Sequence, residues 1–139
     1  MAKVYAARAS DFLGINLNDL IAHQTSFDFY NDIHGSLHSQ TYEDLLRIGF
    51  NAGVDSYAWF GGTGFAFNAG HTAMTAGTVN AYEQQVLSGD SYVTSWGIEG
   101  FSYSGVTMYN AAITPGTTDD YAVLASILAG ADTFDLSSG

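Results

Sequence analysis

The sequence contains no cysteine, so disulfide bonds, thiolate catalysis and cysteine-ligated zinc or iron–sulfur clusters are excluded. Basic residues are also scarce, since three Lys and Arg stand against fourteen Asp and Glu and give a net charge of −11. The bases are Lys3, Arg8 and Arg47, and none follows residue 47. Because such a chain repels phosphate backbones and anionic lipid, neither nucleic acid nor a membrane surface is an expected partner.

Long hydrophobic runs are missing as well. No stretch approaches the roughly 18 apolar residues of a membrane-spanning helix, so no membrane span is expected. The N-terminal residues MAKVYAARASDF lack the apolar core that follows a basic segment in a cleaved signal peptide. Any export is therefore expected to use a route without a cleaved leader.

The residues that are present favour a compact fold. The chain has 139 residues, of which 47% are hydrophobic and only 12% charged, with 16 Gly, 9 Tyr, 9 Phe and a single Pro. This composition argues against disorder, and the length suits one domain that buries roughly 68–70% of its unfolded surface. We expect residues 1–139 to form a single globular domain.

A short helix is predicted at about residues 16–24. Asn16 can accept a hydrogen bond from a free amide at its start, and Asp19 follows three residues later. The apolar residues Leu17, Leu20 and Ile21 share one helical face. The next segment, 25–53, shows no sustained period, and we interpret it as a loop that joins the helix to a strand.

From residue 54 the pattern changes to strands. The aromatic runs 54–60 (VDSYAWF) and 65–68 (FAFN) are separated by residues 61–64 (GGTG), which predict the turn of a hairpin. A second hairpin turn is predicted at residues 88–90 (SGD), and a later strand at 100–105 (GFSYSG). Connections this short favour antiparallel pairing.

The last predicted helix follows the break at 115–117 (PGT). Thr118 can cap it, and Asp119 and Asp120 suit the positive end of the helix dipole. Its apolar stripe consists of Tyr121, Leu124, Ile127 and Leu128, before Gly130. A helix, a run of strands and a final helix together indicate an α+β fold, an antiparallel β-sheet with helices packed on one face.

Three segments carry a family resemblance: LGINLNDLIAHQTSFDFYNDIHGS, GFSYSGVTMYN and DDYAVLASILAG. They resemble the hemophores, secreted bacterial haem carriers that leave the cell by type I export. The resemblance implies a hemophore-like fold, an extracellular location and haem as cofactor. In that family one loop supplies a histidine to the iron, and another supplies a tyrosine supported by a second histidine.

His34 matches the first haem-ligand position, as cofactor-binding and metal-ligating residue. The place of the tyrosine is taken by Phe67, which cannot bind iron, and His71 falls near the supporting histidine. Haem binding would then use His34 alone, His34 with His71, or a tyrosine in a shifted register such as Tyr57. The many aromatic residues could sandwich a porphyrin or another flat apolar ligand, gaining about 25 cal/mol for each Å² buried.

The segment 130–139 (GADTFDLSSG) is similar to the opening of an RTX calcium-binding repeat, with Gly130, Asp132 and Phe134 at matching spacing. One partial repeat cannot close a calcium site, because the ligands come from successive stacked turns. Calcium is therefore not expected within this chain. The partial RTX-like tail again points to type I export.

The remaining histidines have simpler interpretations. His23 lies near the predicted end of the first helix, where a structural role is expected. His38 is four residues after His34, but the intervening Gly35 and Ser36 disfavour a helix that would place both on one metal-binding face. The nine tyrosines and the tryptophans Trp59 and Trp96 are expected to pack in the core or at its rim.

Common enzymatic motifs are missing: the sequence has no G-x-S-x-G elbow, phosphate-binding loop, G-x-G-x-x-G or H-E-x-x-H. We therefore expect no enzyme, although a Ser–His–Asp triad assembled only by the fold stays open. The sequence predicts a secreted, non-enzymatic binding protein that captures haem through His34. The alternative is a structural or adhesive extracellular module that self-associates through its strand edges, or the N-terminal domain of an RTX-type protein.

Overall fold

The computed structural model describes residues 2–6, 16–38, 40–129 and 133–135. Within them one sheet has the strand order β2-β5-β6-β7-β8-β1-β9, and β3 and β4 form a separate hairpin. Neighbours in the main sheet are antiparallel, except for the parallel pair β1 and β9. The strands are β1 (Lys3–Ala6), β2 (Gln24–Tyr30), β3 (Gly35–Leu37), β4 (Gln40–Tyr42), β5 (Asp44–Asn51), β6 (Asp55–Phe67), β7 (Met74–Ser88), β8 (Ser91–Ser104) and β9 (Thr133–Asp135).

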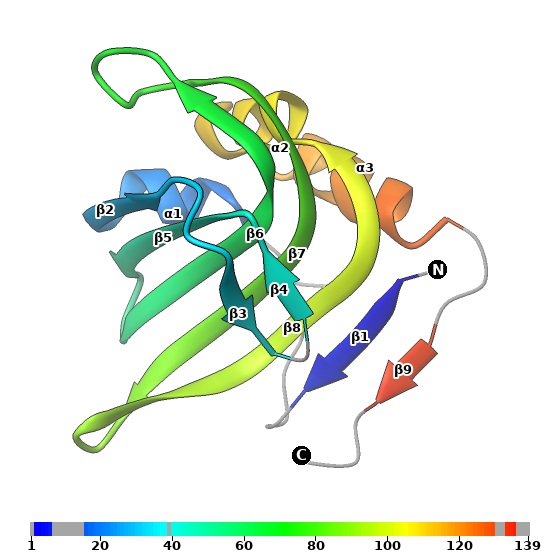
Figure 1. The fold of residues 1–139 in the computed structure, drawn as a ribbon. Helices are drawn as coiled ribbons and strands as arrows, with labels where there is room; N and C mark the ends of the chain where they lie inside the picture. The colour runs from blue at the N-terminus through cyan, green and yellow to red at the C-terminus, as the bar shows by residue number, and fades with distance from the viewer. Residues whose placement is uncertain (1, 7–15, 39, 130–132, 136–139) are drawn as a thin grey trace.

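In the described part of the chain three helices pack on this sheet: α1 (Asn18–Ala22), α2 (Gly105–Ile113) and α3 (Thr118–Ile127). Figure 1 shows them together on one side of the sheet, with the β3–β4 hairpin on the other. The predicted α+β class and the antiparallel sheet are therefore confirmed. None of the helices in the described ranges is both long and apolar enough to cross a membrane.

Side-chain alternation along β5 separates the two faces of the sheet. Leu46 and Ile48 point toward the helices and join a large core with Leu20, Met108 and Leu124. Leu45 points the other way, into a smaller cluster under the hairpin that also contains Leu37, Tyr42 and Ala81. The helix-covered face therefore holds most of the apolar core.

The predicted hairpin turn at residues 61–64 is wrong, because these residues lie inside the long strand β6. The glycines bend the strand instead of reversing it: the pairing with β7 shifts register after Gly61 and again after Thr63. A Cβ at Gly62 would come within 2.0 Å of the carbonyl oxygen of Thr78, and Gly64 has a φ of +67°. The chain reverses later, at residues 68–73.

The predicted loop at 25–53 is also wrong, since strands β2 to β5 occupy most of it. The alternation of Phe27 and Phe29 is that of a strand, because both side chains pack against the helix-side core while Asp28 pairs with Arg47 on the other face. The turn at 88–90 is confirmed by the pairing of Ser88 with Ser91. Of the strand predicted at 100–105, residues 100–104 are the end of β8, whereas Gly105 begins helix α2.

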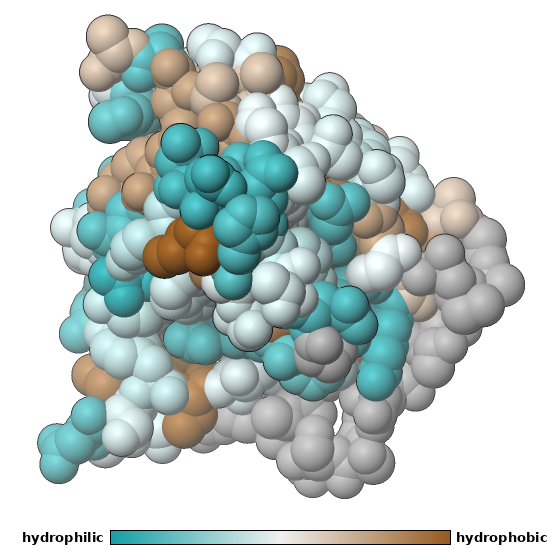
Figure 2. Space-filling model, in the orientation of Figure 1, coloured by the Kyte–Doolittle hydropathy of each residue, from teal (hydrophilic) through white to brown (hydrophobic). Residues whose placement is uncertain are grey.

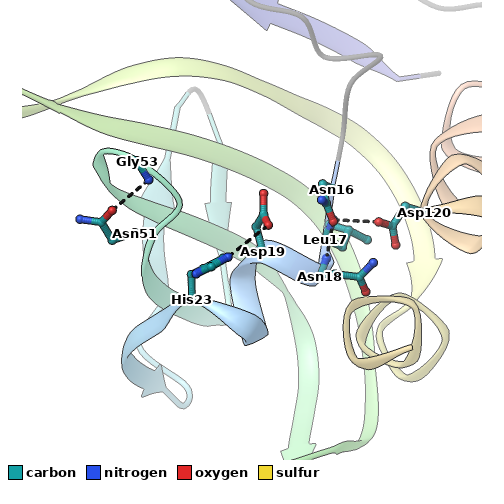
Figure 3. Close-up of polar contacts among 8 residues, drawn as sticks. All are labelled: Asn16, Leu17, Asn18, Asp19, His23, Asn51, Gly53 and Asp120. Carbon is teal, nitrogen blue, oxygen red and sulfur yellow. Dashed lines mark hydrogen bonds and ion pairs between the residues drawn. The ribbon is translucent and has the colours of Figure 1, made fainter. Parts of the chain in front are cut away.

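The helix predictions were partly right. Helix α1 is shorter than predicted, although Asn16 does accept a hydrogen bond from the Asn18 N–H at 3.1 Å (Figure 3). Helix α3 begins at Thr118, so that residue is not its cap, and Tyr121 is 48% exposed instead of part of the buried stripe. Helix α2 was not predicted; the Ser104 side chain caps it by accepting from the Thr107 N–H.

Only part of the RTX-like segment lies within the described residues. Its residues 133–135 form β9, which pairs in parallel with β1. Gly130 and Asp132 lie outside the described residues.

Candidate functional site

His34 lies in the turn that follows β2. Its backbone adopts a left-handed φ of +51°, and its N–H donates to the carbonyl of Glu43 at 3.1 Å. The side chain is 66% exposed, and its Nε2 lies 2.8 Å from Oδ1 of Asp32. A carboxylate at one imidazole nitrogen orients the ring, so Nδ1 is the nitrogen that could bind iron.

His71 lies in the turn between β6 and β7, also with a left-handed φ, of +53°. Its exposed ring stacks on Phe27 with centroids 5.1 Å apart and meets the ring of Phe67 edge-on at 6.0 Å. Its N–H donates to the carbonyl of Asn68 at 3.0 Å. The imidazole of His71 is thus exposed to solvent on one side and packs against the rings of Phe27 and Phe67 on the other.

The side chain of Asn68 organises this turn. Its Oδ1 accepts from the N–H groups of Thr72 at 2.8 Å and Ala73 at 3.2 Å, and its Nδ2 donates to the Thr72 hydroxyl. The hydroxyl of Tyr109, from α2, donates to the carbonyl of His71. The His71 turn is therefore fastened both within itself and to a helix.

Phe67, which stands where the resemblance implies a tyrosine, is part of an aromatic group beside His71. Its ring centroid lies 5.2 Å from that of Phe27, 5.0 Å from that of Phe29 and 6.1 Å from that of Tyr109. Burial raises the pKa of Tyr109. Tyr57, the tyrosine in a shifted register, packs instead with Tyr92 at 4.4 Å and beneath the guanidinium of Arg47 at 4.5 Å.

The segments that carry the two histidines pass the same end of the sheet, after which His71 folds back onto Phe27 on the helix side and His34 leads into β3. Tyr30, the last residue of β2, pairs with Leu45, and Leu45 pairs with Gly61 of β6. The chain continues past this row both into the His34 turn and along β6 to the His71 turn. The two imidazoles do not contact each other, but the segments that carry them share one partner.

That partner is Asp44, whose side chain is buried with only 1% exposure. One carboxylate oxygen accepts from the N–H of Asp32 at 2.8 Å, and the other accepts from the N–H of Phe65 at 2.9 Å. Asp32 belongs to the His34 turn, and Phe65 to the end of β6 that leads to His71. The structure therefore brings the two predicted site segments together through a residue that the sequence did not indicate.

A second polar cluster lies under the β3–β4 hairpin. Tyr5 donates to buried Glu83 at 2.9 Å, and its ring stacks on His38, with the centroids 3.7 Å apart. His38 Nδ1 lies 3.1 Å from Glu99, which is also buried. Burial, and then the charge of Glu99, raise the pKa of Tyr42 to about 12. A cavity of about 330 Å³ adjoins Tyr42 and Glu99.

His38 and His34 do not share a helical face, because β3 separates them. Among the described residues, no three His, Asp or Glu side chains gather as a metal site. His23 follows α1, with its Nε2 3.9 Å from Oδ1 of Asp19 (Figure 3). On the face shown in Figure 2, hydrophobic patches lie apart from one another between hydrophilic ones.

The chain matches no protein-family model, no curated protein and no solved structure. Of the residues that organise the site, Phe27 could have been found from its alternation with Phe29. Asp44 and Asn68 carried no usable signal, since an isolated Asp or Asn in a sequence is most simply interpreted as a turn residue.

Proposed function

We propose that this protein is a secreted, non-enzymatic binding protein that captures a flat apolar ligand, with haem as the leading candidate. The observation that supports this most is the pair of exposed imidazoles, His34 and His71, on turns whose segments pass the same end of the sheet. The His34 turn is hydrogen-bonded to Asp44 through the Asp32 N–H. The His71 turn is connected to Asp44 only through β6, whose Phe65 N–H donates to it. Such an arrangement suits a ligand that is held between two loops.

The chemistry of the two turns suits iron porphyrin. The Asp32 carboxylate, 2.8 Å from Nε2 of His34, orients the imidazole ring, as carboxylates hydrogen-bonded to metal-binding histidines do. Phe27 and Phe67 beside His71 offer aromatic surface to a porphyrin, whose burial contributes about 25 cal/mol per Å². With Phe67 unable to bind iron and Tyr57 engaged by Tyr92 and Arg47, the pair His34 and His71 is the favoured ligand set.

The test is a titration of purified protein with hemin, followed by the Soret band. We expect binding at micromolar hemin, and we expect His34→Ala and His71→Ala each to weaken it by at least about tenfold, since even the loss of a group that only orients a metal ligand costs about that much. His23→Ala is the matched control, since that histidine lies at the end of α1 and should leave the affinity unchanged.

Two outcomes would count against the proposal. The absence of any spectral change with the wild-type protein would exclude haem capture. Equal affinity for hemin and iron-free protoporphyrin, unchanged in both histidine variants, would show stacking without iron ligation.

A self-associating structural or adhesive module is the second candidate. It is favoured by the position of β2 (Gln24–Tyr30) at one end of the strand order, where a second copy could pair with it. Size-exclusion chromatography over a range of concentrations tests this candidate. A strict monomer at high concentration would count against it.

A further inference from the structure

We propose that Asp44 is a positioning residue that fixes the His34 turn relative to the His71 turn; this inference rests on the ligand-binding function proposed above. Asp44 is the first residue of β5 and is almost fully buried. Its two carboxylate oxygens accept from two different segments, at Asp32 and at Phe65.

The hydrogen bond from the Phe65 N–H to Asp44 lies just past the end of the backbone pairing between β5 and β6. The last paired residues of β5 and β6 are Asp44 and Gly62, so the Phe65 N–H lies beyond the reach of the β5 backbone. The pairing of β6 with β7 is also irregular between Thr63 and Ala66. The Asp44 side chain supplies the acceptor that the bent strand lacks, and so holds the bend in place.

The connections from these two bonds to the imidazoles are short and stiff. His34 is two residues after Asp32, its N–H is bonded to the carbonyl of Glu43, and its ring is paired with Asp32 itself. On the other side, β6 leads from Phe65 to the turn that Asn68 braces. A displacement at Asp44 would therefore reach both rings.

A carboxylate has a property here that a neutral acceptor lacks. Either N–H alone could be satisfied by a carbonyl or a hydroxyl, at a lower desolvation cost than a buried charge. A carboxylate offers two acceptor atoms on one rigid planar group and makes stronger, charge-assisted bonds. It therefore fixes the separation of the two N–H groups, and with it the relative position of the segments that lead to the two turns.

The experiment is a double-mutant cycle on hemin affinity with wild type, His34→Ala, Asp44→Asn and the double variant. In Asp44→Asn an amide nitrogen replaces one acceptor, so one of the two N–H groups loses its bond. We expect this variant to weaken hemin binding by about tenfold, within the usual range for coupling residues. In its background His34→Ala should have a much smaller effect, because the two turns no longer act together.

Asp120→Asn is the matched control, since it removes another buried carboxylate that accepts from a backbone N–H, that of Leu17, between α1 and α3. It should bind hemin as the wild type does. Should Asp44→Asn fail to fold by circular dichroism, Asp44→Glu keeps both acceptors and shifts them by one methylene, and the same weakening is expected.

The outcomes separate the two proposals. If the wild type shows no Soret change, the proposed function falls, and the role of Asp44 with it. If the wild type binds hemin but the folded Asp44 variant binds equally well, or the two substitutions act independently, only the positioning role is overturned.

Discussion

The two faces of the sheet differ in how completely their buried carboxylates are hydrogen-bonded. Under the hairpin both oxygens of Glu83 are bonded, to the Tyr5 hydroxyl and to Nε2 of Gln85. On the helix side Asp120 has one oxygen bonded to the Leu17 N–H (Figure 3), while its Oδ1 has no hydrogen-bond partner among the described residues. An unsatisfied buried oxygen lowers the free energy of unfolding. The less favourable of these two buried acids is therefore Asp120, on the helix side.

The difference shows how each face is stabilised. The helix-covered face relies on apolar burial by residues such as Leu46, Ile48 and Ile98, which can outweigh one imperfect polar contact. The hairpin-covered face has only a small apolar cluster, and Tyr5, Glu83 and His38 there are hydrogen-bonded or stacked, whereas the buried Tyr42 hydroxyl has no hydrogen-bond partner among the described residues. We therefore expect truncation of an apolar side chain to destabilise the protein most on the helix-covered face. On the hairpin-covered face we expect stability to be most sensitive to steric clashes.

The largest effect is expected from Leu46→Ala on the helix-covered face. The side chain is 1% exposed in the main core, so its truncation should lower the free energy of unfolding by about 2–5 kcal/mol. Urea unfolding followed by circular dichroism measures this. Thr63→Ala, at an exposed position in β6, is the control; a loss below about 1 kcal/mol for Leu46→Ala would contradict the expected packing of this face.

A smaller effect is expected from Gly97→Ala on the hairpin-covered face. A Cβ at Gly97 would lie 2.3 Å from the Tyr5 hydroxyl oxygen, so the Tyr5 ring must move off Glu83 and His38. Overpacking of this kind costs about 1–3 kcal/mol in the free energy of unfolding. Gly70→Ala is the comparison, because its nearest neighbour would lie at 3.7 Å, and equal stability losses in the two variants would refute the argument.

The smallest effect is a pH dependence from Asp120. Burial raises the pKa of this carboxyl to about 6 in the folded protein, from an ordinary value of 3.8. The folded state therefore binds the proton more tightly than the unfolded chain, and the contribution of this group to stability is lost as the pH rises from about 4 to about 6.

Asp120→Asn should remove this part of the pH dependence, because its amide stays neutral and its oxygen can still accept from Leu17. The measurement is the difference between variant and wild-type unfolding free energies at pH 4 and pH 7.5. Asp119→Asn, in the same helical turn, should reduce the slope only in part, because burial is the largest cause of the raised pKa of Asp120 and the charge of Asp119 a smaller one. A wild-type slope retained in Asp120→Asn would show that another group is responsible.

Local patterns predicted much of the fold and little of the site. Local residue preferences predict the turn at 88–90 and a helix near 118–128. Gly89, for example, adopts a φ of +65°, a conformation that glycine allows. The same reasoning failed at 61–64, because glycine permits a bent strand as readily as a turn. His34 and His71 could be proposed from the sequence, but their shared fastening to Asp44 could not.

The sequence by itself determined the acidic charge, the absence of thiol chemistry, the α+β class and the two exposed histidine turns, because each follows from composition or from neighbours along the chain. Only the tertiary structure decided that β6 runs through its glycines and that Asp44 joins two segments 33 residues apart, from Asp32 to Phe65. Hydrogen bonds of this kind depend on where strands meet in space. The spacing of these residues along the sequence does not indicate that they contact each other.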